Sequence, residues 1–190
     1  THDGNRSRQR ISISHTMKRL HIVGRKNHGK TTLIVELIGE LTQIGLKVGV
    51  IKHSSHRHEL DTPGKDSHRQ RLAGAAPVSV VTDGLIGIYM PRSPAAEFYT
   101  ALEPMYRNCD LVLVEGHIDC EGTKLEVWRS SVGTGGPIAE DRDDIHAVIT
   151  DDVANLSIPL WPRGNVENLA DRICQLLNGR SGLPSRPAKP

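Results

Sequence analysis

The chain has 190 residues, of which 37% are hydrophobic, and this size suits one soluble domain with a sizeable core. The net charge of +2 arises at the ends, because residues 1–16 carry +2 and residues 179–190 carry +3, which leaves −3 on the middle. That distribution and an aromatic content of 3% argue against nucleic-acid binding, which favours a basic surface and stacking rings. No apolar run reaches the roughly 20 residues that cross a bilayer, so we expect a cytoplasmic protein without a membrane partner.

The two ends are predicted to lie outside the folded domain. Residues 1–16 are rich in Arg, Ser, His and Asn without apolar periodicity, and indicate a disordered or appended segment. Residues 179–190 contain three prolines and two glycines, a composition typical of a disordered tail. We therefore expect one folded domain over residues 17–178.

The domain is predicted to begin with a strand, a loop and a helix in that order. The strand is a short apolar run that ends at Gly24: Leu20, Ile22 and Val23. Residues 24–31 then read Gly-Arg-Lys-Asn-His-Gly-Lys-Thr, a full G-x-x-x-x-G-K-[ST] pattern, called here the phosphate loop. Apolar residues after it recur on one face of a helix: Leu33, Ile34, Leu37, Ile38 and Leu41.

This order predicts a site for a nucleotide and Mg²⁺. Gly24 and Gly29 allow a tight turn that brings backbone N–H groups to phosphate oxygens, and the free N–H groups of the new helix point at the same anion. Lys30 supplies a positive charge for the β- and γ-phosphates, and Thr31 offers a hydroxyl to the metal. The nucleotide-binding residues predicted here are Gly24, Asn27, His28, Gly29, Lys30, Thr31 and Thr32.

A second strand is predicted over residues 46–53, and a polar segment follows it. In a parallel sheet Lys52 would end at the same edge as the phosphate loop, so it is a further nucleotide-binding candidate. Asp61 and Asp66 are candidates for a magnesium contact and, weakly, for catalysis, because either carboxylate could orient water. Alternatively, Asp66 or Ser67 caps the next helix.

The same segment carries three histidines that suggest a different chemistry. His53, His56 and His58 could bind zinc or nickel, since imidazole is a common ligand for both ions. A short His-rich tract is only a compositional clue, and solvated histidines would explain it equally well.

The remaining elements alternate between helix and strand patterns. Residues 67–73 suggest a short helix, 77–81 and 85–90 strands, 95–108 a mixed helix and 111–114 a buried strand. Strands over 123–129 and 146–150 follow, and a closing helix over 166–177 places Leu169, Ile173, Leu176 and Leu177 on one face. The alternation predicts an α/β fold of three layers, a P-loop NTPase with a mostly parallel sheet flanked by helices.

Two acidic residues flank the buried strand, and only one can serve the phosphate loop. Asp110 and Glu115 lie roughly 16 Å apart along a strand that rises about 3.3 Å per residue. Ligands bind beyond the carboxyl ends of parallel strands, so Glu115 is predicted to approach the metal. Asp151 or Asp152, after the strand that ends at Thr150, could accept the N–H donors of guanine, although either could instead cap a helix.

These motifs together resemble the MobB family, the molybdopterin-guanine dinucleotide biosynthesis adaptor proteins. The resemblance covers roughly residues 18–178 and rests on a set of short motifs: the phosphate loop, Lys52-His53, Asp61-x-Pro63-Gly64-Lys65-Asp66-Ser67 with Arg69, Ala73-Gly74-Ala75 and Leu113-Val114-Glu115-Gly116. It implies a GTP-binding protein, often dimeric, that assists the enzyme attaching GMP to molybdopterin. It also implies Gly24, Gly29, Lys30, Thr31 and Thr32 at the nucleotide, with Glu115 and Asp61 or Asp66 near Mg²⁺.

The leading hypothesis is a GTP-binding accessory protein of molybdenum cofactor biosynthesis, with weak or partner-dependent hydrolysis. Its expected partners are the guanylyltransferase, molybdopterin and a second copy of the chain, for which residues 123–129 and 132–137 are candidate surfaces. A P-loop kinase or ligase acting on a small metabolite, or a metal-delivery GTPase, are the alternatives. Phosphoryl transfer needs an oriented nucleophile, and no spacing identifies a catalytic base. The sequence therefore supports binding more strongly than turnover.

Overall fold

A six-stranded parallel sheet forms the centre of the molecule. The computed structural model describes residues 17–54, 59–92, 94 and 97–178, so the predictions for residues 1–16 and 179–190 lie outside the described residues. The strand order is β2-β5-β1-β6-β7-β8. The bounds of these strands are Arg19–Val23 for β1, Val48–Lys52 for β2, Leu111–Glu115 for β5, Thr123–Val127 for β6, Ala147–Ile149 for β7 and Leu160–Trp161 for β8.

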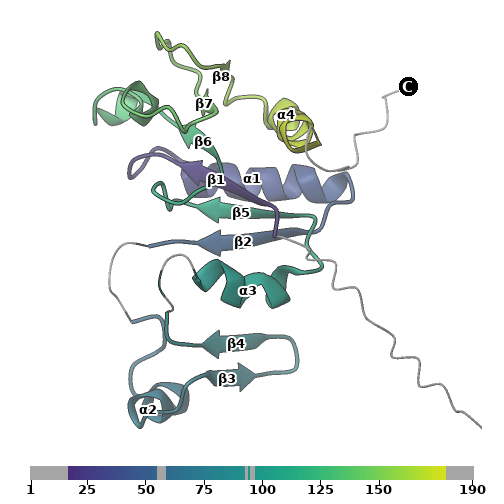
Figure 1. Ribbon diagram of the computed structural model, residues 1–190, viewed down its shortest axis with the longest axis vertical. Coiled ribbons are helices and arrows are strands. Elements are labelled where there is room, and N and C mark those ends of the chain that lie inside the picture. The colour runs from purple at the N-terminus through teal and green to yellow at the C-terminus, as the bar shows by residue number, and fades with distance from the viewer. Residues whose placement is uncertain (1–16, 55–58, 93, 95–96, 179–190) are drawn as a thin grey trace, which may run out of the picture.

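Helices cover both faces of this sheet (Figure 1). Helices α1 (Lys30–Gln43) and α4 (Val166–Asn178) share one buried apolar cluster with alternate residues of the central strands. Helix α3 (Phe98–Tyr106) packs on the other face, where Tyr99 contacts a second cluster with Ile51, Val112 and Val114. The predicted three-layer α/β fold is confirmed, because each sheet face buries its own apolar cluster against helices.

The register of the parallel strands brings their carboxyl ends together. Strand β5 pairs with β1 and with β2, and Glu115 lies opposite Ile22 on one side and Lys52 on the other. Four residues of β5, Leu111 to Val114, are fully buried, as expected for a strand with helices on both faces. The end of β5 therefore lies between the ends of its two neighbours.

The strands predicted over 77–81 and 85–90 are confirmed, but they do not join this sheet. They are β3 (Val78–Val81) and β4 (Ile86–Tyr89), which pair antiparallel as a separate hairpin. Helix α2 (Asp66–Leu72) lies beside the hairpin, below α3 in Figure 1. A parallel pair needs a crossover of a dozen or more residues, whereas residues 82–85 allow only a tight turn. We call α2 and the hairpin, with the loops that join them, the outer lobe (residues 59–92).

Several finer predictions are also corrected. Helix α2 begins after Lys65 without a side-chain cap, so neither Asp66 nor Ser67 caps it. Strand β8 was not predicted, because two residues carry too little periodicity. The 3₁₀ turns Ser130–Val132 and Ile138–Glu140 were missed for the same reason.

Strand β6 pairs with β1 and β7 and is almost wholly buried, so residues 123–127 cannot be a dimer surface.

Within the described residues, no helix combines the length and the apolar character that a membrane crossing requires.

Candidate functional site

The phosphate loop connects the end of β1 to the start of α1, and its glycines are required by geometry. Gly24 has φ +138°, and a Cβ atom there would lie 2.4 Å from the carbonyl oxygen of Val127 at the end of β6. Gly29 precedes the helix with φ +91°, and Asn27 also adopts a positive φ of 69°. Positive φ is costly for residues with a side chain. The loop therefore holds its compact shape because glycine stands at the two positions that need it.

Lys30 closes over the loop that precedes it. Its Nζ donates to the carbonyl oxygens of Gly24 at 2.8 Å and Arg25 at 2.7 Å. An ammonium has three N–H groups, so one remains for an anion. Burial lowers the pKa of Lys30, and the nearby charge of Glu115 opposes this shift. The lysine is positioned before any ligand arrives.

Thr31 and Glu115 meet beside Lys30, as the sequence predicted. The Thr31 hydroxyl donates to Glu115 Oε1 at 2.8 Å, and Lys52 Nζ lies 3.6 Å from the same oxygen. A hydroxyl and a carboxylate are the oxygen donors that Mg²⁺ prefers, and Glu115 is largely buried with 13% of its side chain exposed. Asp110 instead accepts from the backbone N–H of Lys47 at the opposite edge, as expected. This pair of oxygens fits Mg²⁺ together with its water ligands.

His28 does not present its side chain to a ligand, although it was predicted to bind nucleotide. It is 1% exposed, its Nδ1 accepts from the backbone N–H of Arg129 at 3.0 Å, and its Nε2 lies 2.7 Å from Thr134 Oγ1. Because Nδ1 is an acceptor, Nε2 carries the proton and donates to Thr134. Burial, aided by the charges of Lys30 and Arg129, lowers the pKa of His28, which favours the neutral ring. The ring anchors the loop to the chain after β6.

Arg129 is a site residue that sequence reasoning missed. Its Nε donates to the carbonyl oxygen of His28 at 3.1 Å and its Nη2 to that of Asn27 at 3.1 Å. These partners are about a hundred residues apart in the chain, and Arg129 belongs to no local motif. The guanidinium holds the outer side of the phosphate loop.

Two stacked histidines form a wall of the pocket beside the phosphate loop. This pocket of about 520 Å³ is lined by Lys30, Lys52 and Glu115 as well as by His53 and His117. The two imidazole rings stack with centroids 4.1 Å apart, and the hydroxyl of Tyr99 lies 2.8 Å from His117 Nδ1. Burial lowers the pKa of both histidines. Sequence reasoning noticed His53 but not its partner, which has a positive φ of 58°.

The metal-binding alternative for the histidines stays a prediction, because two of the three lie outside the part of the chain that is described. His56 and His58 lie outside it, and the described residues contain no group of three side chains that could hold a metal ion. His53 is engaged in ring stacking.

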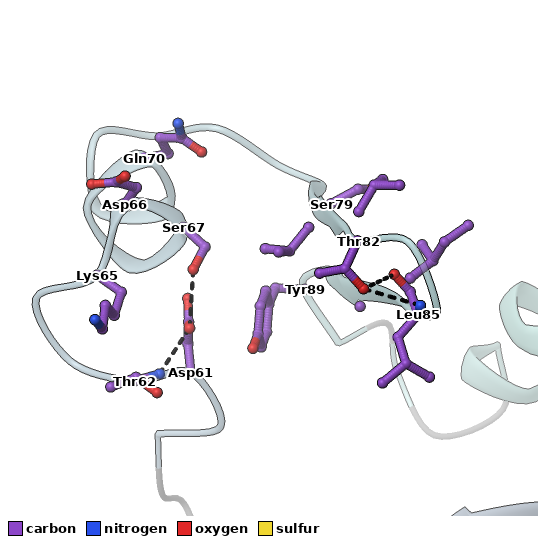
Figure 2. Close-up of a pocket in the computed structure, with 14 residues that line it drawn as sticks. Asp61, Thr62, Lys65, Asp66, Ser67, Gln70, Ser79, Thr82, Leu85 and Tyr89 are labelled. Carbon is purple, nitrogen blue, oxygen red and sulfur yellow. Dashed lines mark hydrogen bonds between the residues drawn. The ribbon is translucent and has the colours of Figure 1, made fainter.

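Asp61 and Asp66 line a different cleft, which lies between α2 and the β3–β4 hairpin (Figure 2). Neither residue is among those that line the pocket at the phosphate loop. Their assignment to Mg²⁺ or to catalysis stays a prediction, and this arrangement does not bring them to Thr31 and Glu115.

Asp151 and Asp152 follow β7 at the carboxyl edge of the sheet and bind backbone. Asp151 Oδ1 accepts from the N–H groups of Arg163 at 2.7 Å and Gly164 at 3.0 Å. Asp152 Oδ2 accepts from the N–H of Ser130 at 2.8 Å. Both carboxylates thus position loops around the edge rather than capping a helix.

Comparison with known proteins agrees with these features. Residues 19–151 match the family described as molybdopterin guanine dinucleotide synthesis protein B. The chain is 35% identical over 159 residues to the molybdopterin-guanine dinucleotide biosynthesis adapter protein of Escherichia coli, with 81% of this chain and 90% of that protein covered. A protein of the same name from Haemophilus influenzae is 32% identical over 164 residues, covering 86% and 91% of the two chains.

Solved structures show the same architecture. A crystal structure of molybdopterin-guanine biosynthesis protein B has a TM-score of 0.63 and 26% identity, with 84% of this chain and 99% of that chain covered. The crystal structure of Bacillus subtilis MobB has a TM-score of 0.64 at 22% identity, covering 84% and 97%, and shares the fold. The phosphate loop, the Thr31–Glu115 contact and these similarities lead to one conclusion: the chain belongs to the MobB family.

Proposed function

We propose that this protein binds GTP with Mg²⁺ at the phosphate loop and serves as an accessory protein in molybdopterin-guanine dinucleotide biosynthesis. The observation that carries the proposal is the 2.8 Å contact between Thr31 and Glu115, beside a lysine already directed over the loop. Gly24, Asn27, Gly29, Lys30 and the start of α1 would hold the phosphates. Thr31 and Glu115 would hold Mg²⁺, which neutralises phosphate charge when it is bound.

The proposed preference for guanine over adenine rests on membership of the family and on the carboxylate of Asp151. Asp151 retains a second oxygen beyond the one that accepts from Arg163 and Gly164, and a carboxylate oxygen suits the N–H donors of guanine. We assign Asp151 to base recognition on this ground. GTP is then expected to bind at least tenfold more tightly than ATP, since a missing charged hydrogen bond costs about 1.5–3 kcal/mol.

The nucleotide site is built for binding more than for turnover. We assign no described residue as the base that activates water. We therefore expect GTP hydrolysis to be slow and to depend on a partner. The expected partner is the guanylyltransferase that attaches GMP to molybdopterin. Copurification with that enzyme, and a measured gain in its product, would test the accessory role; an unchanged product yield would count against it.

Calorimetric titration of the full chain with GTP and ATP in Mg²⁺ tests nucleotide binding. Lys30→Ala should weaken GTP binding by at least tenfold, because it removes a positioned cation from the loop. Lys47→Ala is the matched control, since it removes an equal charge from an exposed position at the opposite edge of the sheet. Equal losses in the two variants, or equal affinity for GTP and ATP, would contradict the proposal.

A homodimer formed through the outer lobe is part of the same proposal. The β3–β4 hairpin exposes large apolar side chains, among them Val81 at 70% and Ile86 at 69%. Each strand pairs only with the other in the described structure, so both outer edges are open to another chain. An isolated two-stranded hairpin is marginal in water, and a second copy would cover it.

Sedimentation equilibrium should therefore show a dimer that Ile86→Lys converts to monomer. Val153→Lys is the matched control, because Val153 is 97% exposed outside the hairpin. A dimer that survives Ile86→Lys would place the interface elsewhere.

A further inference from the structure

Lys52 is a residue of the pocket beside the phosphate loop to which the proposed nucleotide site gives no specific role. It ends β2, and the strand register places it directly opposite Glu115 at the carboxyl end of β5. Its side chain is 66% exposed and lines the same pocket as Lys30 and Glu115. The sheet edge alone makes Lys52 a general nucleotide candidate, whereas the contacts of its ammonium indicate which part of the nucleotide it meets.

The ammonium of Lys52 is held weakly by one carboxylate. Its Nζ lies 3.6 Å from Glu115 Oε1, and the described residues offer it no other ion pair. The same oxygen accepts a much shorter hydrogen bond from the Thr31 hydroxyl, at 2.8 Å. A separation of 3.6 Å is too long for a hydrogen bond, so the ammonium keeps its N–H donors for another acceptor.

Lys30 and Lys52 bring two positive charges to one carboxylate. Burial is the main cause of the lowered pKa of Lys30; the charge of Glu115 opposes this shift, and the charge of Lys52 adds to it. The two ammonium groups are thus close enough to repel each other. The other charged residues that line the pocket, Lys26 and Asp119, have opposite signs and cancel. The pocket therefore keeps an excess of positive charge, which favours an anion.

The two lysines approach that anion from different sides. Lys30 Nζ is committed to the carbonyl oxygens of Gly24 and Arg25 within the phosphate loop. The strand order β2-β5-β1 places Glu115 between Lys52 and the end of β1, where the loop begins. A phosphate loop holds the inner phosphates with its backbone, and the metal bridges the β- and γ-phosphates. Lys52, beyond the predicted metal ligand, therefore faces the terminal phosphate.

Metal binding would release Lys52 from its present partner. Mg²⁺ bound at Thr31 and Glu115 would supply the positive charge that the carboxylate now receives from Lys52. The remaining carboxylate of the pocket, Asp119, is already paired with Arg142 at 3.0 Å. The phosphates of the nucleotide are then the anions open to the Lys52 ammonium.

We propose that Lys52 distinguishes GTP from GDP: it pairs with Glu115 until GTP and Mg²⁺ bind, and then donates to the γ-phosphate. This inference rests on the proposed function, because it assigns a residue to one phosphate of the same nucleotide. Lys52 is thereby a specificity-determining residue, and the proposal gives it no part in activating water.

Calorimetric titration of the full chain with GTP and with GDP, both in Mg²⁺, tests the role of Lys52. Wild-type protein should bind GTP more tightly than GDP. Lys52→Ala should weaken GTP binding by about tenfold, because a hydrogen bond between charged groups is lost. It should weaken GDP binding by about threefold or less, since only a screened, exposed charge is removed. The preference for GTP over GDP should therefore shrink.

Three further variants separate this role from a general effect of charge. Lys47→Ala removes an equal charge from an exposed position before the other end of β2, and it should leave the preference unchanged. Lys52→Arg keeps the charge and should keep the preference. Lys30→Ala should weaken both GTP and GDP, because the lysine of a phosphate loop reaches the β-phosphate as well as the γ-phosphate.

Several results would overturn the proposal. They are equal affinity of wild-type protein for GTP and GDP, equal losses of both in Lys52→Ala, and the same change of preference in Lys47→Ala. Lys52→Gln keeps most of the side-chain stem and removes the charge, so it provides the same comparison if the alanine variant fails to fold.

The titrations also distinguish failure of this inference from failure of the proposed function. Absence of GTP binding by wild-type protein would contradict both. Tight GTP binding by wild-type protein, with a preference over GDP that Lys52→Ala leaves unchanged, would contradict the role of Lys52 alone.

Discussion

The phosphate loop and the outer lobe carry similar polar groups but hold them in different ways. Around the phosphate loop, Lys30, Thr31 and Glu115 bind one another, and a parallel sheet buried on both faces supports them. The outer lobe is built from short elements and exposes much of its apolar surface. The polar groups of the phosphate loop are therefore held by contacts within the chain. The outer lobe instead exposes apolar side chains, which is typical of a surface that binds another molecule.

The largest difference between the regions should appear at their glycines. Gly24→Ala should cost about 3 kcal/mol, because a positive φ and a close contact with the Val127 carbonyl both oppose a Cβ atom. Gly64→Ala in the outer lobe is the matched control: Gly64 also has a positive φ of 82° but no atom within 4 Å, so about 1 kcal/mol is expected. Urea unfolding measures the loss in free energy of unfolding for both variants. Equal losses would show that the contact with β6 does not restrict the phosphate loop.

A buried ion pair should contribute more than the exposed one in the lobe. Lys124 in β6 is 2% exposed, and its Nζ lies 2.7 Å from Asp144 Oδ2. Asp144→Asn leaves this ammonium buried without its counter-charge, at about 2 kcal/mol, since Asp144 itself is partly exposed to solvent. We expect the melting temperature to fall by about 4–8 °C. Glu59→Gln, which breaks the pair with Arg71 in the lobe, should lower it less; the reverse order would contradict the comparison.

Arg129 should affect nucleotide affinity, although no sequence motif points to it. Arg129→Ala removes two hydrogen bonds to carbonyl oxygens of the phosphate loop, and GTP should bind about tenfold more weakly. Arg69→Ala in the outer lobe is the control, because Arg69 is 75% exposed and, among the described residues, its side chain forms an ion pair only with Asp66, at 4.0 Å. Unchanged GTP affinity in Arg129→Ala would mean that the loop keeps its shape without this support.

The smallest expected effect is the acid sensitivity of the outer lobe. The hydrogen bond from Arg71, followed by the N–H of Asp61, lowers the pKa of Glu59 from 4.5 to about 2. A lowered pKa means that the contribution of Glu59 to stability is full above about pH 4.5 and is lost as the pH falls towards 2. The difference in unfolding midpoint between wild type and Glu59→Gln should be constant from pH 5 to 7 and shrink below pH 4. A difference that stays constant at pH 3 would refute this assignment.

Much of the nucleotide site could be predicted because its information is local or follows from strand geometry. The glycine, lysine and threonine spacing defined the phosphate loop, and counting along β5 separated Glu115 from Asp110. The role of His28 could not be predicted, because its partners Arg129 and Thr134 come from the far end of β6. A strand pattern also does not reveal its pairing partner, so the antiparallel pairing of β3 with β4 could not be predicted.

By itself the sequence determined the phosphate loop, the strand and helix around it, the acidic residue at the end of β5 and the family. These features depend on residue type and on spacings within one or two elements, where backbone geometry leaves few choices. Only the tertiary structure decided that His28 and Arg129 secure the loop, that His53 stacks on His117, and that Asp61 lies in a separate cleft. Those contacts join residues far apart in the chain, so they follow from packing rather than from any local pattern.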